Sequence, residues 1–324
     1  MGLTFVAGRV SVRVPATSAN LGPGFDSLGL ALALYDEVSA EVAPAGCQVR
    51  VSGEGAGRLP TDETHLVVRA MRATFDALGG QPAGLLVDCV NRIPQARGLG
   101  SSSAAIVAGV RLAHALVTDG AERLDEAGVL RLAAELEGHP DNVAPCLLGG
   151  FTIAWTEPAG ASVAGSTGGG ARALTLAPDP AVRPTVFVPE RQGLTEVARA
   201  ALPATVPHSD AAYNAGRSAL LVHALTADPE LLLAATEDRL HQGYRAAGMP
   251  ETAELVAALR AAGVPAVVSG AGPTVLALVT PPEGFEAGMD WTVLRLPIDD
   301  TGAQVVRGRL GHAERDPVAA GRKS

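Results

Sequence analysis

One run of small residues, GLGSSSAA at positions 98–105, constrains the fold of this chain more than any other feature. A buried-type strand, LLVDCV at 85–90, precedes it, and an apolar helical pattern, IVAGVRLAHAL at 106–116, follows it directly. Glycines at such a turn let two backbones approach closely. The start of a helix also presents unpaired N–H groups and partial positive charge, which can hold a phosphate. The run therefore predicts either a tight packing turn or a phosphate-binding loop.

Two standard phosphate loops do not fit this run. A Walker loop requires a lysine directly after its last glycine, and no lysine follows these glycines. A dinucleotide-binding fingerprint requires a third glycine where Ser103 stands. The sequence thus favours a phosphate-binding loop of another type.

The composition narrows the class of protein. A length of 324 residues suggests about two domains. A formal charge of −9 argues against a nucleic-acid partner. Cys47, Cys89 and Cys146 form no CxxC pair, which is typical of reduced thiols in a cytoplasmic protein. The first residues lack the pattern of a signal peptide, and no long apolar run predicts a membrane span.

The pattern along the chain predicts an α+β fold, because helices and strands mix without a regular βαβ alternation. Period-two alternation and apolar runs predict strands at 9–15, 48–53, 85–90 and 185–189 and a pair within 269–279. Helical spacing predicts helices at 65–79, 106–116, 126–138, 195–202, 210–226, 229–240 and 251–262. The Gly- and Ser-rich segment 158–172 is expected to be a mobile surface loop near a domain boundary. We expect domains at 1–165 and 166–300 and a polar tail at 301–324.

Several segments together resemble one family. IPQARGLGSSSAA (93–105) resembles the second conserved motif of the GHMP small-molecule kinases, named for galactokinase, homoserine kinase, mevalonate kinase and phosphomevalonate kinase. PATSANLGPGFDSLGLAL (15–32) resembles their first motif in its homoserine kinase form, and SGAGPTVLAL (269–278) resembles their third. EGHPDNVAP (137–145), TEVARAALP (195–203) and HSDAAYNAGRSALLVHAL (208–225) are similar to further homoserine kinase segments. The matches follow the family's order from about residue 9 to residue 280.

This resemblance implies a fold and an activity. The fold would be the two-domain GHMP kinase fold, with a ribosomal protein S5 domain 2-like first domain, a ferredoxin-like second domain and the site between them. The activity would be ATP-dependent phosphorylation of the side-chain hydroxyl of L-homoserine to O-phospho-L-homoserine, a step of threonine biosynthesis, by a cytoplasmic homodimer. Two alternatives stay open: another GHMP kinase acting on mevalonate, shikimate or a sugar, and a non-catalytic homologue that only binds small molecules.

The resemblance also assigns the nucleotide end of the site. Mg²⁺ would be held by Glu137 and by a hydroxyl of Ser101 or Ser102, in keeping with the preference of this ion for oxygen ligands. Glu135 is expected to be an ordinary surface acid. His65 stands where homoserine kinases commonly carry Asn, near the adenine end, which raises the question of nucleotide preference. The residues expected to bind ATP are Pro94, Arg97, Gly98, Leu99, Gly100, Ser101, Ser102 and Ser103.

The same resemblance assigns the homoserine end. Two guanidinium groups, of Arg199 and Arg245, are expected to clamp the substrate carboxylate, because arginine binds carboxylates bidentately; Arg217 is a weaker third candidate. Asp26, Asp141 and Arg199 are expected next to the reacting groups, both aspartates in substrate binding rather than in proton removal. The need for a protein base stays open, since the phosphate itself could accept the proton. The residues expected to contact homoserine are Asn20, Asp26, His139, Asp141, Arg199 and Arg245.

Overall fold

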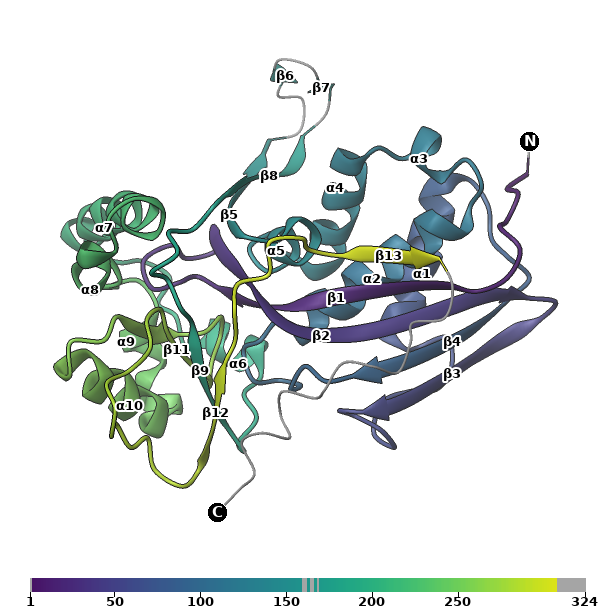
Figure 1. Cartoon of the computed structure of the whole chain (residues 1–324). Helices are drawn as coiled ribbons and strands as arrows, with labels where there is room; N and C mark the ends of the chain where they lie inside the picture. The colour runs from purple at the N-terminus through teal and green to yellow at the C-terminus, as the bar shows by residue number, and fades with distance from the viewer. Residues whose placement is uncertain (1, 159–161, 164–165, 168, 308–324) are drawn as a thin grey trace.

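Two main β-sheets with helices packed on them, together with a small two-stranded sheet, make up the described part of the molecule in the computed structural model (Figure 1). The structure describes residues 2–158, 162–163, 166–167 and 169–307. Mixed helix and sheet content without a regular βαβ alternation confirms the predicted α+β class.

Among the described residues, the larger sheet has seven strands. Its path runs β13-β1-β2-β4-β3, and β5 pairs with β2 and with β8. All pairs are antiparallel except β3 and β4, which are parallel and joined through a helix. The strands are β1 (Val10–Ala19), β2 (Leu28–Ala43), β3 (Gly46–Gly53), β4 (Gly84–Asn91), β5 (Phe151–Glu157), β8 (Gly170–Leu176) and β13 (Gln304–Arg307).

Helices lie on one side of this sheet (Figure 1). In α1 the apolar residues recur at helical spacing, so Val67, Met71 and Phe75 are buried in the main hydrophobic core, on the side where α1 packs against α2. His65 caps the start of α1, and Gly79 ends it in the left-handed conformation with φ 100°. The helices are α1 (Leu66–Leu78), α2 (Ser101–Leu116), α3 (Gly120–Arg123), α4 (Glu126–Glu137) and α5 (Val143–Leu148).

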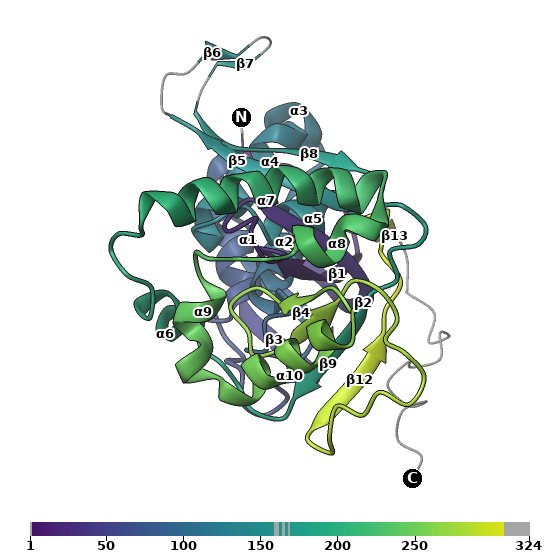
Figure 2. The ribbon, with the colours of Figure 1, turned by 90° about the vertical axis from the view of Figure 1, so that its left-hand side faces the viewer.

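The second sheet is antiparallel, in the order β10-β11-β9-β12. The expected ferredoxin-like unit is largely present: β9 is followed by helices, then by the β10–β11 hairpin, and finally by β12 on the other side of β9. It lacks the second helix of that unit, because residues 278–290 form a loop. In Figure 2, α6 stands at the edge of the molecule and is joined to α7 by an extended stretch. The strands are β9 (Thr185–Pro189), β10 (Ala266–Val268), β11 (Val275–Ala277) and β12 (Trp291–Arg295). The helices are α6 (Thr195–Ala200), α7 (His208–Thr226), η1 (Pro229–Leu231), α8 (Leu232–Ala235), α9 (Gln242–Arg245), η2 (Ala246–Gly248) and α10 (Pro250–Ala261).

Most predicted elements are present, and one predicted helix is wrong. The helix expected at 229–240 ends at Ala235. The carboxylate of Asp238 accepts hydrogen bonds from the backbone N–H groups of Leu240, His241 and Gln242, which holds the following residues in a turn. The sixteen-residue strand β2, in the middle of the large sheet, was not predicted.

Sheet membership changes later in the chain than the predicted boundary at 165. Both β5 and β8 belong to the large sheet, and the second sheet begins at Thr185. The segment expected as a loop, 158–172, contains the short strands β6 (Ser162–Val163) and β7 (Ser166–Thr167), and residues 159–161, 164–165 and 168 lie outside the described residues. The expected tail 301–324 begins with β13, which pairs with β1; residues 308–324 lie outside the described residues.

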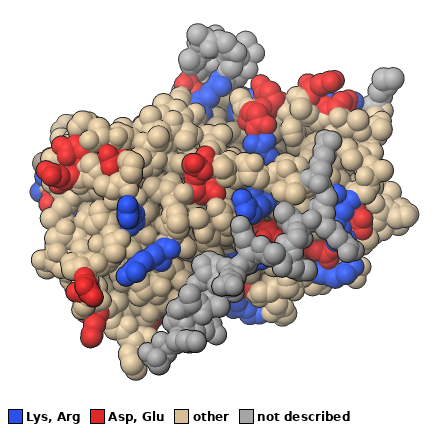
Figure 3. All heavy atoms as spheres, viewed as in Figure 1, with Lys and Arg blue, Asp and Glu red and all other residues tan. Residues whose placement is uncertain are grey.

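Two surface properties follow from these elements. None of the helices in the described ranges combines the length and the hydropathy that a membrane-spanning helix requires. On the face shown in Figure 3, the acidic and basic side chains of the described residues are interspersed among uncharged ones. The negative formal charge is therefore not gathered in one area of this face.

Candidate functional site

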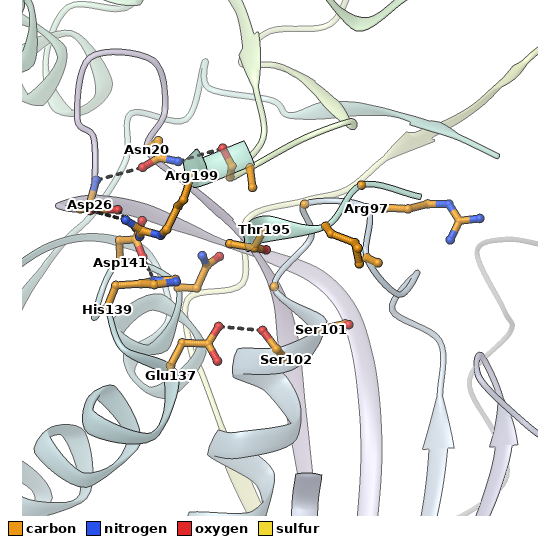
Figure 4. Close-up of a pocket in the computed structure, with 18 of the residues that line it drawn as sticks. Asn20, Asp26, Arg97, Ser101, Ser102, Glu137, His139, Asp141, Thr195 and Arg199 are labelled. Atoms are coloured by element: carbon orange, nitrogen blue, oxygen red, sulfur yellow. Dashed lines mark hydrogen bonds and ion pairs between the residues drawn. The ribbon is translucent and has the colours of Figure 1, made fainter. Parts of the chain in front are cut away.

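A cavity of about 230 Å³ lies where the two sheets meet, at the start of α2 (Figure 4). Segments from six distant parts of the sequence form its wall: the loop after β1, the small-residue loop before α2, the turn after α4, helix α6 with the residues before it, the end of α9 and the turn between β10 and β11. Its lining residues are Asn20, Asp26, Ala96, Arg97, Gly98, Gly100, Ser101, Ser102, Glu137, His139, Asp141, Asn142, Gly193, Leu194, Thr195, Arg199, Arg245, Gly270 and Ala271.

The glycines of the small-residue loop pack against the protein itself. A Cβ on Gly98 would lie 2.3 Å from the backbone oxygen of Ser269, and one on Gly100 would lie 1.9 Å from Oγ1 of Thr17. Both glycines have positive φ, 78° and 70°. Ser269 Oγ also donates to the carbonyl of Gly98 at 2.6 Å. The motif at 269–278 therefore packs on the loop, and close packing explains the two glycines without any ligand.

Replacement of Gly98 by alanine is expected to destabilise the fold by more than about 2 kcal/mol, because the strained φ and the clash with a backbone oxygen add. Gly57→Ala is the matched control: φ is 73° there, but nothing lies within 4 Å of the added Cβ. Urea unfolding of both variants measures the difference. Equal losses in the two variants would contradict the close packing of Gly98.

The first turn of α2 presents an uncapped N-terminus to the cavity. Its cap residue, Gly100, has no side chain, and the first turn carries no acidic residue. The N–H groups of Ser101, Ser102 and Ser103 precede the first intrahelical bond, which Ala104 donates to the carbonyl of Gly100. Such a terminus favours a bound anion.

Glu137 ends α4 directly opposite this turn. Its Oε1 accepts hydrogen bonds from the hydroxyls of Ser102 and Ser103, each at 2.7 Å (Figure 4 shows the bond from Ser102). Ser101 lines the cavity as well. Glu135, two residues earlier, is exposed and lies outside the cavity lining, in agreement with its expected role as a surface acid.

Three residues that were expected to bind ATP do not direct their side chains into the cavity. Leu99 is fully buried in the core, where it anchors the loop. The guanidinium of Arg97 donates to the carbonyls of Pro189, Gln95 and Glu190, and in Figure 4 it points away from Ser102. Pro94 does not line the cavity. The candidates for phosphate contact in this loop are therefore its backbone N–H groups and the hydroxyls of Ser101 and Ser102.

The loop after β1 holds Asn20 and Asp26 in strained conformations. Their φ values are 68° and 54°, in the left-handed region. Asn20 fixes the loop, since its Oδ1 accepts from the N–H of Asp26 at 2.9 Å and its Nδ2 donates to the carbonyl of Gly270 at 2.8 Å. These bonds use the Asn20 side chain to position the carboxylate of Asp26.

Arg199, on α6, forms a bidentate pair with Asp26 across the cavity. Its Nη2 and Nη1 lie 2.8 Å and 3.1 Å from the two carboxylate oxygens. The hydrogen bond to Asp26 raises the pKa of Arg199 above its usual value. No residue of α6 is buried, so this pair reaches across from a lightly packed helix.

Arg245 lies deeper, with 4% of its surface exposed. Its Nε donates to the carbonyl of Ala198 at 3.0 Å, which links it to the end of α6. Burial, followed by the charge of Arg199, lowers the pKa of Arg245 below its usual value. Both guanidinium groups face the ring of Phe25, at 5.8 Å for Arg199 and 5.4 Å for Arg245. The weaker candidate Arg217 instead contacts Tyr213 and Glu237, outside the cavity lining.

His139 and Asp141 form a hydrogen-bonded pair in the turn after α4. His139 Nδ1 lies 2.6 Å from Oδ1 of Asp141, whose side chain is almost fully buried. Burial lowers the pKa of His139, but the hydrogen bond and charge of Asp141 outweigh it, so the pKa is raised above its usual value. The pair therefore favours the protonated imidazole.

This raised pKa predicts a pH-dependent contribution to stability. The folded chain binds the His139 proton more tightly than the unfolded chain, so the stabilisation is complete below the unfolded pKa of 6.5 and is lost as the pH rises through the higher folded pKa. We expect the difference in unfolding free energy between the wild type and His139→Gln to shrink from about pH 5.5 to about pH 8.5. Urea titrations at several pH values measure it, and a difference that stays constant would contradict the pair.

Two polar residues of the cavity wall were not predicted as site residues. Asn142 starts α5 without capping it, and its Oδ1 accepts from Oγ1 of Thr17 at 2.8 Å. Thr195 opens α6 and faces the cavity (Figure 4). Asn142 lies in the same sequence segment as His139 and Asp141, and Thr195 lies in the same segment as Arg199. Their closeness in sequence to these predicted site residues is the signal that could have identified them.

Comparisons with known proteins identify the family. The model of the GHMP kinases N terminal domain matches residues 65–150, and that of the GHMP kinases C terminal domain matches residues 221–287. The homoserine kinases of Streptomyces coelicolor and Streptomyces avermitilis are each 57% identical over 309 residues, 94% of this chain and 97% and 98% of theirs. The crystal structure of homoserine kinase from Cytophaga hutchinsonii superimposes with a TM-score of 0.76 at 27% identity, over 94% of this chain and all of that one. The chain belongs to the GHMP kinase family and, within it, to the homoserine kinases.

Proposed function

We propose that this protein transfers the γ-phosphoryl group of ATP to the side-chain hydroxyl of L-homoserine. The observation that carries the proposal is a single cavity with an anion-binding helix terminus at one end and an arginine–aspartate pair at the other. The first suits a polyphosphate, and the second suits the carboxylate and ammonium groups of an amino acid. The names and identities of the relatives support the same substrate pair.

At the nucleotide end, the N–H groups of Ser101, Ser102 and Ser103 would hold phosphate oxygens. Mg²⁺ fits the residues present, because it prefers oxygen ligands and the carboxylate of Glu137 and the hydroxyl of Ser102 place two oxygen atoms 2.7 Å apart. Within the described part of the chain, no group of three or more acidic, histidine or cysteine side chains could hold a metal ion. Phosphate oxygens and water would complete the ligand set. The bound ion would neutralise part of the charge of the triphosphate.

At the amino-acid end, the pair of Arg199 and Asp26 would open to admit the substrate. Arg199 would bind the carboxylate of homoserine in the bidentate geometry that it now makes with Asp26. Asp26, released, would accept from the ammonium group. Arg245, fixed to Ala198, supports the same carboxylate from the deeper side. The ion pair between Arg199 and Asp26 would thus be replaced by two ion pairs with the substrate, so that neither side chain would be left without a partner of opposite charge.

Phosphoryl transfer depends mainly on such positioning and on charge stabilisation. The amino-acid contacts would hold the hydroxyl of homoserine in line with the γ-phosphorus, beside Asp141 and His139. The hydroxyl oxygen forms the new P–O bond while the bond from the γ-phosphorus to the bridging oxygen of ADP breaks. The loose transition state lets the proton leave late, to a phosphate oxygen of the transferred group, so Asp26 and Asp141 serve in binding.

The alternatives make different demands on the same residues. A mevalonate, shikimate or sugar kinase could use the helix terminus but would have no amino group for Asp26. A non-catalytic homologue would not require Glu137 opposite the serines, and this chain keeps that arrangement. A homodimer and a cytoplasmic location stay predictions from the family resemblance.

The test is ADP release with ATP and Mg²⁺ across a panel of alcohols: L-homoserine, D-homoserine, L-serine, mevalonate, shikimate and galactose. We expect turnover with L-homoserine and much slower turnover with the others. Turnover with a non-amino-acid alcohol instead would overturn the assignment of Arg199 and Asp26. Binding of ATP without turnover on any alcohol would favour the non-catalytic homologue.

A further inference from the structure

Arg245, the buried guanidinium at the amino-acid end of the cavity, is held by hydrogen bonds along one side. Its Nε donates to the carbonyl of Ala198 at 3.0 Å, and its Nη1 donates to Nδ1 of His241 at 3.1 Å. The carbonyl of Gly270 lies 3.5 Å from the same Nη1. Among the described residues, Nη2 has no such partner. Nη2 is therefore the nitrogen left for a ligand in the cavity that Arg245 lines.

His241 is completely buried, and both of its ring nitrogens have partners next to the cavity. Nε2 lies 2.8 Å from the carbonyl oxygen of Gly22, in the loop that carries Asp26. Nδ1 lies 3.1 Å from Nη1 of Arg245. The imidazole also stacks on the ring of Phe25, the neighbour of Asp26, with 5.1 Å between the centroids. One side chain thus contacts both the loop of Asp26 and the guanidinium of Arg245.

The two hydrogen-bond partners allow His241 only one protonation state. The carbonyl of Gly22 can only accept, so Nε2 must carry a proton, and the guanidinium of Arg245 can only donate, so Nδ1 must carry none. Burial lowers the pKa of His241 below its usual value, although the carboxylate of Asp238 lies 3.7 Å from Nε2. His241 is therefore a neutral ring that accepts from Arg245 and donates to the loop.

The backbone that carries His241 is itself fixed on both sides. The carboxylate of Asp238 accepts from the N–H groups of His241 and Gln242 at 3.1 and 2.8 Å. The side-chain oxygen of Gln242 accepts from the N–H of Val268, in strand β10 of the second sheet, at 2.7 Å. The imidazole is thus attached to a turn that is bonded to the sheet, and it can hold its own partners in place.

We propose that His241 is a positioning residue for the amino-acid substrate, because it directs Arg245 toward the substrate carboxylate and fixes the loop that carries Asp26. His241 does not line the cavity, so it acts through these two groups and not by touching the substrate. The proposal rests on the proposed function and adds the residue that sets the geometry of its carboxylate site. Without the bond to Nδ1, Nη1 of Arg245 would lose its shorter contact and the guanidinium could turn about the bond to Ala198.

Two substitutions separate the two hydrogen bonds of His241. In His241→Asn the amide oxygen takes about the place of Nδ1, so an acceptor for Arg245 remains while the bond to Gly22 is lost. In His241→Gln the longer side chain brings its amide N–H to about the place of Nε2, so the bond to Gly22 remains while Arg245 loses its acceptor. We expect the KM for L-homoserine to rise about tenfold in His241→Gln and less in His241→Asn, with the KM for ATP unchanged in both.

A substrate without a carboxylate distinguishes positioning from a general loss of structure. The compound is 3-aminopropan-1-ol, which is homoserine without its carboxylate group. Because Arg245 acts on that group, His241→Gln should lower kcat/KM for L-homoserine about tenfold and change kcat/KM for 3-aminopropan-1-ol by less than about twofold. If this alcohol reacts too slowly, its inhibition constant against L-homoserine gives the same comparison. His223→Gln, at an exposed position of α7, is the matched control and should change none of these values.

The outcomes separate the role of His241 from the proposed function. Equal losses on the two substrates in His241→Gln, or a loss on L-homoserine that is as large in His241→Asn, would overturn the role of His241 while turnover by the wild type stands. If His241→Gln does not fold, His241→Leu is compared with His241→Asn, since both lack the bond to Gly22 and they differ in the acceptor for Arg245. A wild type that does not phosphorylate L-homoserine would instead overturn the proposed function.

Discussion

Replacement of Arg199 by alanine is expected to lower kcat/KM for L-homoserine roughly 100-fold, with ATP binding changed by less than about twofold. The guanidinium lies 2.8 Å and 3.1 Å from Asp26 and is the group placed to receive the substrate carboxylate. Its removal leaves Asp26 of the free enzyme without its cation and leaves the substrate carboxylate with Arg245 alone. Most of the loss should therefore appear as a higher KM, with a further loss in kcat where the hydroxyl is held less accurately.

Two further variants control this prediction. Arg199→Lys keeps the charge but loses the bidentate geometry, so its kcat/KM should fall between those of the wild type and Arg199→Ala. Arg217→Ala removes an arginine that contacts Tyr213 and Glu237 outside the cavity, and its kcat/KM should stay close to that of the wild type. A full kcat/KM in Arg199→Ala would show that another group binds the carboxylate.

Replacement of Glu137 by glutamine is expected to lower kcat by about 10²- to 10³-fold, as for the loss of one charged group that stabilises the transition state. The amide keeps an oxygen that can accept from Ser102 and Ser103, so the fold around α2 should persist. The variant loses the negative charge that would bind Mg²⁺ opposite the helix terminus. The Mg²⁺ concentration required for half-maximal turnover should therefore rise along with the loss in kcat.

The matched control for this variant lies two residues away on the same helix. Glu135→Gln removes the same charge from an exposed position outside the cavity, and it should leave kcat and the Mg²⁺ requirement unchanged. Equal effects in the two variants would mean that kcat depends on the overall negative charge at the end of α4 and not on Glu137 as a direct metal ligand. Unchanged kcat in Glu137→Gln would remove Glu137 from the proposed metal site.

The local elements were predictable because their signals are local. The small-residue run correctly indicated a helix directly after it, although α2 begins at Ser101, within the run, and not at residue 106 as predicted. Gly79 correctly indicated the end of α1. In contrast, β2 is rich in alanine and leucine, which have little preference for strands, and its conformation is set by pairing with β1, β4 and β5. The segment 229–240 shows the opposite case, since its helix propensity is overridden by the bonds of Asp238.

The candidate site was predictable as a set of residues but not as an arrangement. The motifs pointed to Asp26, Glu137, Asp141 and Arg199, all of which line one cavity. The pairing of Arg199 with Asp26 joins residues 173 positions apart, and no local pattern encodes it. Nor does the sequence show that the guanidinium of Arg97 turns to backbone carbonyls.

The most direct test of the central claim is phosphorus NMR of the products formed from ATP, Mg²⁺ and L-homoserine. The account predicts one new phosphate monoester signal, coupled to the two protons of the terminal CH₂ group of homoserine, that grows in step with ADP. A signal from inorganic phosphate alone, or from a phosphorylated carboxylate or amine, would contradict it.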